Sequence, residues 1–172
     1  MPETAETSRL RTAAVPLSRG PLARSPIVSW TLRVGTAAAL GIDAVVHWQN
    51  APAYDAVTAT ISQGALFRAE AVLAVAAGLL VLVRPRTSSW VAALAVAASA
   101  LAAVLLYRYV DVGPLGPLAD MYENTWQVPG KLLSASAEAA AVVVAALGLV
   151  THRKHPGIQG LRPVAAIGRK RG

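Results

Sequence analysis

Cysteine is absent from this sequence of 172 residues, and methionine occurs only as Met1 and Met121. Without thiols the chain can form no disulfide bond, no thiolate metal site and no dithiol redox centre. Two methionines are also too few for a copper(I) site built from thioethers. The sequence therefore predicts no Cys-ligated metal, and the membrane dithiol oxidoreductases are excluded as a class.

Histidine is almost as scarce as methionine. Only His47 lies within an apolar segment, whereas His152 and His155 follow the last such segment. A haem held by two histidines needs two that face each other inside the membrane, so a bis-His haem is excluded. The chain also lacks a glycine-rich phosphate loop, a nucleophile elbow and a zinc-protease motif. We therefore predict no catalytic residues and no cofactor.

Charged residues are few, and they are unevenly placed. They make up 15% of the chain, against roughly a quarter in soluble domains, while 55% of the residues are hydrophobic. A net charge of +7 would suggest nucleic-acid binding if it were spread over a soluble fold. Here most basic residues lie in the two terminal tails, so we predict a lipid bilayer as the surroundings and no nucleic-acid partner.

The apolar residues gather into four long segments. A bilayer core of ~30 Å needs ~20 helical residues to cross it. The tails have no apolar pattern and are predicted to be disordered. We therefore predict an all-α integral membrane four-helix bundle, with helices at about 27–48, 65–83, 90–107 and 131–150 in a transmembrane domain over 26–151, and disordered basic tails at 1–25 and 152–172.

The distribution of lysine and arginine predicts the topology. Twelve lie in the two tails or at Arg84 and Arg86, against three (Arg68, Arg108 and Lys131) at the other ends of the helices. The positive-inside rule then places both termini in the cytoplasm of a multi-pass plasma-membrane protein. The basic tails are expected to contact anionic lipid, at ~1 kcal/mol per cation near the surface.

Residues 51–53, Ala-Pro-Ala, have the small-residue pattern of a signal-peptidase site. The apolar segment before them is long enough to span a bilayer, and it carries Asp43. We therefore expect the chain to remain uncleaved after Ala53. An intact first helix keeps the number of helices even, as two termini on one side require.

The third connection, residues 108–130, is long and partly apolar. Glycine-proline pairs at 113–114 and 116–117 predict turns. Apolar residues after Pro117 have helix-like spacing, so we predict a short interfacial helix there. Its side chains are expected to cap the outer mouth of the bundle, notably Tyr122, Glu123 and Trp126.

The acidic residues form the one group of side chains in the sequence that points to a chemical function. Asp43, Glu70 and Glu138 lie within three different helices at similar depth, and His47 follows Asp43 by one helical turn. An isolated charge at such a depth costs ~3 kcal/mol or more, so these groups should face the bundle and pair. Two outer cations are candidate charge partners, Arg68 and Arg108, and Arg108 is the better placed for Glu70 or Glu138.

Three interpretations of this cluster stay open. It can be a structural polar network that fixes the helix register, which needs only paired groups. It can handle protons or cations, because carboxylates near a histidine suit that task. It can also bind a metal ion, because Asp43, His47, Glu70 and Glu138 together supply enough oxygen and nitrogen ligands.

Residues 30–150 also show a resemblance. The stretches APAYDAV, GALFRAEA and YRYVDVGPLGPLADMYENTWQVPGKLLSASAEAAA resemble uncharacterised small four-helix integral membrane proteins of actinobacteria. The resemblance implies a multi-pass fold in a bacterial plasma membrane, and it implies no activity. The alanine-rich, arginine-over-lysine composition is that of a high-GC genome.

These features favour a non-enzymatic accessory, sensor or scaffold subunit with an outer-facing acidic and histidine cluster. The tails and outer loop would then bind a membrane or extracytoplasmic protein partner, or a second copy in a homo-oligomer. One alternative is a small transporter or proton- or cation-handling protein that uses the cluster. A second alternative is a membrane enzyme that acts on a lipid or quinone beside His47.

Overall fold

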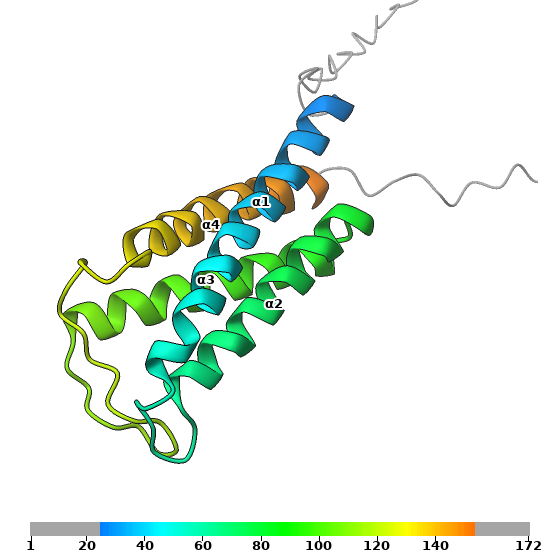
Figure 1. Ribbon diagram of the computed structural model, residues 1–172. Coiled ribbons are helices and arrows are strands. Elements are labelled where there is room, and N and C mark those ends of the chain that lie inside the picture. The colour runs from blue at the N-terminus through cyan, green and yellow to red at the C-terminus, as the bar shows by residue number, and fades with distance from the viewer. Residues whose placement is uncertain (1–24, 154–172) are drawn as a thin grey trace, which may run out of the picture.

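The computed structural model describes residues 25–153. Over this range the chain forms four long α-helices, and every predicted helix boundary lies within three residues of the observed one. A short 3-10 helix that the sequence did not indicate follows the first of them. The elements are α1 (Pro26–Asn50), η2 (Ala51–Tyr54), α2 (Gln63–Val83), α3 (Thr87–Tyr109) and α4 (Lys131–Arg153), as Figure 1 shows.

The predictions for the two tails lie almost entirely outside the described residues. At the C-terminal side one detail is corrected, because His152 and Arg153 were assigned to the tail. Both residues instead form the last turn of α4. Cationic side chains at a helix C-terminus interact favourably with the carbonyl dipoles there, which explains why the helix extends past its apolar run.

Local chemistry sets where the helices begin and end. Pro26 occupies the first turn of α1, where its missing N–H would have no partner. Ser62 caps α2, because its hydroxyl accepts a hydrogen bond from the amide of Ala65 at 3.1 Å. The turn between α2 and α3 is held by Ser89, whose hydroxyl donates to the carbonyl of Arg84 at 2.6 Å. Gly130, with φ of +77°, supplies the left-handed turn before α4.

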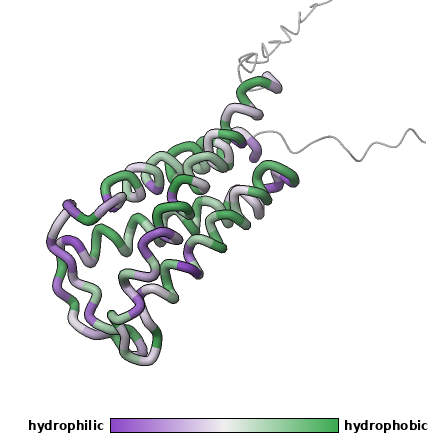
Figure 2. Tube along the Cα trace, in the orientation of Figure 1, coloured by the Kyte–Doolittle hydropathy of each residue, from purple (hydrophilic) through white to green (hydrophobic). Residues whose placement is uncertain are grey.

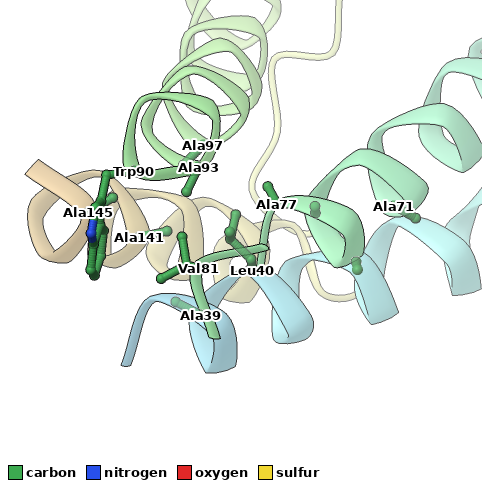
Figure 3. Close-up of a cluster of buried hydrophobic side chains, with 12 residues drawn as sticks. Ala39, Leu40, Ala71, Ala77, Val81, Trp90, Ala93, Ala97, Ala141 and Ala145 are labelled. Atoms are coloured by element: carbon green, nitrogen blue, oxygen red, sulfur yellow. The ribbon is translucent and has the colours of Figure 1, made fainter. Parts of the chain in front are cut away.

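The core between the helices is built mainly from alanine. Figure 3 shows Ala39, Ala77, Ala93 and other alanines lining the helix contacts, with Leu40, Val81 and Trp90 as the bulky side chains among them. Small side chains let helix backbones approach closely. One close approach is at Gly148 of α4, where the ring of Trp90 fills the space that a Cβ would need. α1 packs extensively along α2 and α4, whereas the contact between α2 and α3 is smaller than that between α3 and α4.

Three of the four helices, α2, α3 and α4, are long and apolar enough to cross a membrane. Their outward faces carry exposed leucines and valines, such as Leu73, Leu80 and Leu147. Figure 2 shows the helices as mostly hydrophobic and the loops at one end as more hydrophilic. α1 is equally long but carries Arg33, Asp43 and two terminal amides, so its composition is less apolar.

The interfacial helix predicted after Pro117 is wrong. Residues 110–130 form turns and extended backbone without a helix. Two side chains there accept hydrogen bonds from the backbone two residues ahead: Asp120 from the amide of Tyr122, and Thr125 from the amide of Gln127. Such local bonds compete with helical ones. The segment is also tied to its neighbours, because Thr60 and Ile61 both donate backbone hydrogen bonds to the carbonyl of Pro117.

Both ends of the described chain lie at one end of the molecule. Figure 1 shows the start of α1 and the end of α4 together there, while the connections α1–α2 and α3–α4 meet at the opposite end. We call this opposite end the loop end. The acids within the helices, Asp43, Glu70 and Glu138, lie toward it.

Candidate functional site

Two helices each contribute a pair of polar residues one turn apart. Asp43 and His47 come from α1, and Ser134 and Glu138 come from α4. Spacing of four residues places each pair on one helix face. The four side chains meet between the helices and are called the polar cluster below.

Distances within the polar cluster are those of hydrogen bonds. His47 Nδ1 lies 2.9 Å from Asp43 Oδ1. The Ser134 hydroxyl lies 2.5 Å from the same oxygen and 3.2 Å from Glu138 Oε1. Ligand atoms of Asp43, His47 and Glu138 all lie within 4.8 Å of one another. This arrangement can hold a proton or a metal ion.

The polar cluster is buried but incompletely satisfied. Asp43 and Glu138 are 0% and 1% exposed. Asp43 Oδ2 and Glu138 Oε2 are inaccessible to solvent and have no hydrogen-bond partner. Buried polar atoms are normally paired, so two unpaired carboxylate oxygens in one cluster require an explanation.

Glu70, the fourth predicted member, lies apart from the other acids. It belongs to α2 and lines a cavity that His47, Ser134 and Glu138 also line. The cavity has a volume of about 410 Å³ and lies beneath the loop end. Glu70 Oε1 is likewise buried without a hydrogen-bond partner. The structure thus brings three predicted residues into contact and places the fourth on the wall of a shared cavity.

The predicted charge partners do not neutralise these acids. Arg68 forms a bidentate ion pair with Asp55: Nη1 lies 2.7 Å from Oδ1, and Nη2 lies 2.8 Å from Oδ2. This guanidinium holds the pKa of the Asp55 carboxyl below its usual range. The prediction that Arg108 pairs with Glu70 or Glu138 is wrong, because its guanidinium lies over the rings of Tyr109 and Trp126. Position in sequence could not show that Arg108 contacts two aromatic rings and forms no ion pair with either acid.

The three residues predicted to cap the mouth have different positions. Glu123 lines the cavity and is fixed by two hydrogen-bond donors: the Tyr54 hydroxyl at 3.0 Å and Lys131 Nζ at 3.1 Å. Trp126 packs against Tyr109, with ring centroids 6.4 Å apart. Tyr122 is exposed. The closure at the loop end therefore centres on Glu123, which links η2, the third connection and α4.

The Tyr54–Glu123 contact predicts a pH dependence of stability. Burial, together with the negative charge of Glu123, raises the pKa of the Tyr54 phenol from 10.0 to about 12. The stabilisation is therefore complete below pH 10 and is lost as the pH rises through about 12. Tyr54→Phe is expected to unfold at a lower temperature than the parent at neutral pH, with the difference shrinking over this alkaline range.

Thermal unfolding in detergent at a series of pH values measures this difference. Tyr122→Phe is the matched control, because the Tyr122 side chain is exposed, and it should give the same unfolding temperature as the parent. A gap between the parent and Tyr54→Phe that stays constant through pH 12 would contradict the role of the phenolic proton.

Three residues of the site were not predicted in these roles. Ser134 joins the two acids, and a signal for it existed, because it precedes Glu138 by four residues as Asp43 precedes His47. Phe67 and Tyr54 form an aromatic wall beside His47, with the Phe67 ring 5.1 Å from the imidazole and 5.0 Å from the Tyr54 ring. This wall depends on how α1, η2 and α2 pack, so no local pattern indicates it.

Comparisons with protein-family models, with curated proteins and with solved structures found no match to this chain. The function of the site is therefore inferred from its own geometry.

Proposed function

We propose that this is a multi-pass protein of a bacterial plasma membrane that binds a small cation at the polar cluster and acts as a non-enzymatic accessory or sensor subunit. The cation is a proton or a divalent metal ion. One observation carries the proposal: two buried acids share a cluster in which carboxylate oxygens have no hydrogen-bond partner.

The number of available hydrogens supports a bound cation. Ser134 has one hydroxyl hydrogen, yet its oxygen lies within hydrogen-bond distance of Asp43 and Glu138. The second donor, His47 Nδ1, is directed at Asp43. If Ser134 donates to Asp43, Glu138 receives no hydrogen from the cluster. A proton on one carboxyl group, or a metal ion between the ligands, supplies the missing positive partner.

The charge balance supports the same conclusion. Over residues 25–153 the lysine and arginine side chains with assigned contacts are engaged elsewhere: Arg33 with the carbonyl of Val81, Arg68 with Asp55, Arg108 with the rings of Tyr109 and Trp126, and Lys131 with Glu123. Among the described residues, His47 then pairs with Asp43, and no lysine or arginine forms an ion pair with Asp43 or Glu138. Buried charges persist when they are paired or bind a metal, so a cation is the expected third component.

The positions of the lysine and arginine residues also support a membrane orientation. We propose that α1 spans the bilayer beside α2, α3 and α4, because it packs along α2 and α4 over the bundle. Its Arg33 and Asp43 are accommodated by internal contacts, with Val81 and with Ser134 respectively. We propose that both termini are cytoplasmic, because Arg84, Arg86 and Arg153 lie at helix ends opposite the loop end and the positive-inside rule favours such residues in the cytoplasm.

A sensor or accessory role is favoured over transport by the packing beyond the polar cluster. Beyond the polar cluster, toward the end opposite the loop end, the bundle is filled by the alanine-rich core with Leu40, Val81 and Trp90. The cavity reaches Glu138 from the loop-end half, where Glu123 and Lys131 also line it. A carrier needs access to its site from both sides in turn, whereas a sensor needs access from one.

Thermal unfolding of the purified protein in detergent tests the proposal. Titration with Zn²⁺, Mn²⁺ or Ca²⁺ should raise the unfolding temperature if a metal binds, since a ligand at 100 times its Kd stabilises by about 2.7 kcal/mol. If the cation is a proton, the unfolding temperature should instead change with pH in the absence of metal. Below pH 10, where the Tyr54 contact does not change, either response should disappear in the variant with both Asp43→Asn and Glu138→Gln.

Asp111→Asn is the matched control, because it removes an exposed carboxylate of the third connection. It should respond to metal and pH as the parent does. If the parent and the double variant respond equally to every metal and every pH, the polar cluster is a structural network and the proposal is wrong.

A further inference from the structure

The cavity beneath the loop end has the size and lining of a small-molecule site. Its volume of about 410 Å³ falls within the range of about 300–1,000 Å³ found for ligand pockets. Most of its wall is apolar, with side chains from α2, α3 and the third connection: Leu66, Phe67, Leu73, Val104, Met121 and Val128. A proton or a metal ion at the polar cluster alone would leave most of this apolar cavity empty.

Besides Glu123, which is held by Tyr54 and Lys131, two acidic residues line the cavity. Glu138 comes from α4 and Glu70 from α2. Glu138 is 1% exposed, and its Oε2 has no hydrogen-bond partner. Glu70 Oε1 is also buried and unpartnered. The two helices thus each contribute to the cavity wall an acid with a buried, unpaired carboxylate oxygen.

Aromatic rings also line the cavity, and they suit the binding of a cation. Phe67 and Tyr54 line the cavity next to His47, and Tyr107 lines it from α3. Ring faces attract organic cations, and the attraction grows when water is excluded. Lys131, the lysine on the lining, is held by the backbone and side chain of Glu123. Its charge is therefore matched locally, and the acids remain available.

The cavity is most open on its side, between α2 and α3. Leu73 of α2 is 53% exposed although it lines the cavity. Ala69 of α2, together with Ser99 and Ala103 of α3, also combines exposure with a place on the lining. By contrast, Met121 at the loop end is 9% exposed. An opening between two lipid-facing helices admits molecules that partition into the bilayer.

We infer that this cavity binds a hydrophobic organic cation, an ammonium or phosphonium ion with an aromatic or alkyl body, which enters from the bilayer between α2 and α3. The positive centre lies against Glu138 and Glu70, and the apolar body lies along Phe67, Leu66 and Val104. This inference rests on the proposed function, because it assigns the positive charge that the polar cluster requires to the head of a larger ligand.

Binding of tetraphenylphosphonium to the purified protein in detergent, measured by isothermal titration calorimetry, tests the inference. Tetraphenylborate has the same shape and the opposite charge, so it is the matched control probe. The parent should bind the phosphonium and not the borate. Glu138→Gln and Glu70→Gln should each weaken phosphonium binding about tenfold or more, because each removes a buried charge opposite the cation. Asp111→Asn should leave the affinity unchanged.

Ala103→Trp tests the lateral entrance without altering any charged group. The indole should fill the gap between α2 and α3 and abolish phosphonium binding, while circular dichroism shows unchanged helix content. This variant also keeps the inference testable if the glutamate variants fail to fold. Continued phosphonium binding by Ala103→Trp, or equal binding of both probes by the parent, would overturn the inference.

The two proposals fail in distinguishable ways. If the parent responds to metal or pH but does not bind the phosphonium, the cation site exists and the inference about an organic ligand is wrong. If it binds the phosphonium and ignores both metal and pH, the small-cation proposal is wrong. Phe67→Leu separates the sites further, because it should weaken phosphonium binding severalfold and leave the metal or pH response intact.

Discussion

Replacing His47 by leucine is expected to lower the free energy of unfolding by about 3 kcal/mol, because removing one partner of a buried ion pair leaves the other charge uncompensated. Asp43 is 0% exposed and lies 2.9 Å from the imidazole. In the His47→Leu variant it would keep only the Ser134 hydroxyl as a donor. Unfolding in mixed micelles of a mild and a denaturing detergent, followed by circular dichroism, measures the change.

A double-mutant cycle separates this coupling from lost packing. The variant with both His47→Leu and Asp43→Asn carries no buried aspartate charge, so it should regain part of the lost stability. Trp48→Leu is the neighbouring control, since its side chain is 58% exposed and it should cost far less. Additive effects of His47→Leu and Asp43→Asn would show that the two residues do not stabilise each other.

Gly64→Ala should be nearly as damaging, although it adds a single methyl group. A Cβ at Gly64, in the first turn of α2, would overlap Asp55 Oδ1 and the carbonyl oxygen of Ala51. Ala51 is completely buried, so its backbone cannot easily move away. Overpacking of this kind costs about 1–3 kcal/mol and occasionally more, and we expect the upper end here. The same detergent titration measures the loss.

Gly41→Ala is the matched control for this substitution. Gly41 lies within α1, and a Cβ there meets no atom within 4 Å. Alanine is the better helix former, so Gly41→Ala should be neutral or stabilising by up to about 1 kcal/mol. If Gly64→Ala were as stable as the parent, the close contact between η2 and the start of α2 would not exist in the folded protein.

The helices could be predicted because the information for them is local. Apolar runs of about the bilayer thickness, bounded by Pro26, by Arg84 and Pro85, and by Gly130, determine where each helix begins or ends. The pairing of Asp43 with His47 was visible for the same reason, since both lie on one helix one turn apart. The predictions of the helices and of the Asp43–His47 pair succeeded because a single segment of the sequence contains all the information for each.

The features that could not be predicted from the sequence depend on contacts between segments. Arg108 pairs with aromatic rings rather than acids, and Glu123 is fixed by Tyr54 and Lys131, because the third connection folds back over the helix ends. The helix predicted after Pro117 does not form, because Asp120 and Thr125 accept hydrogen bonds from nearby backbone amides instead. The cavity could not be predicted either, because it depends on how far apart α2 and α3 lie.

The polar cluster joins two helices whose other ends are the two ends of the described chain. Asp43 and His47 project from α1, and Ser134 and Glu138 project from α4, so each hydrogen bond between them spans the α1–α4 contact. Rotating α4 by one residue, about 100°, would separate all of them at once. These hydrogen bonds therefore fix α1 against α4 near the loop end, and the same two helices carry Pro26 and Arg153, the first and last helical residues, at the opposite end.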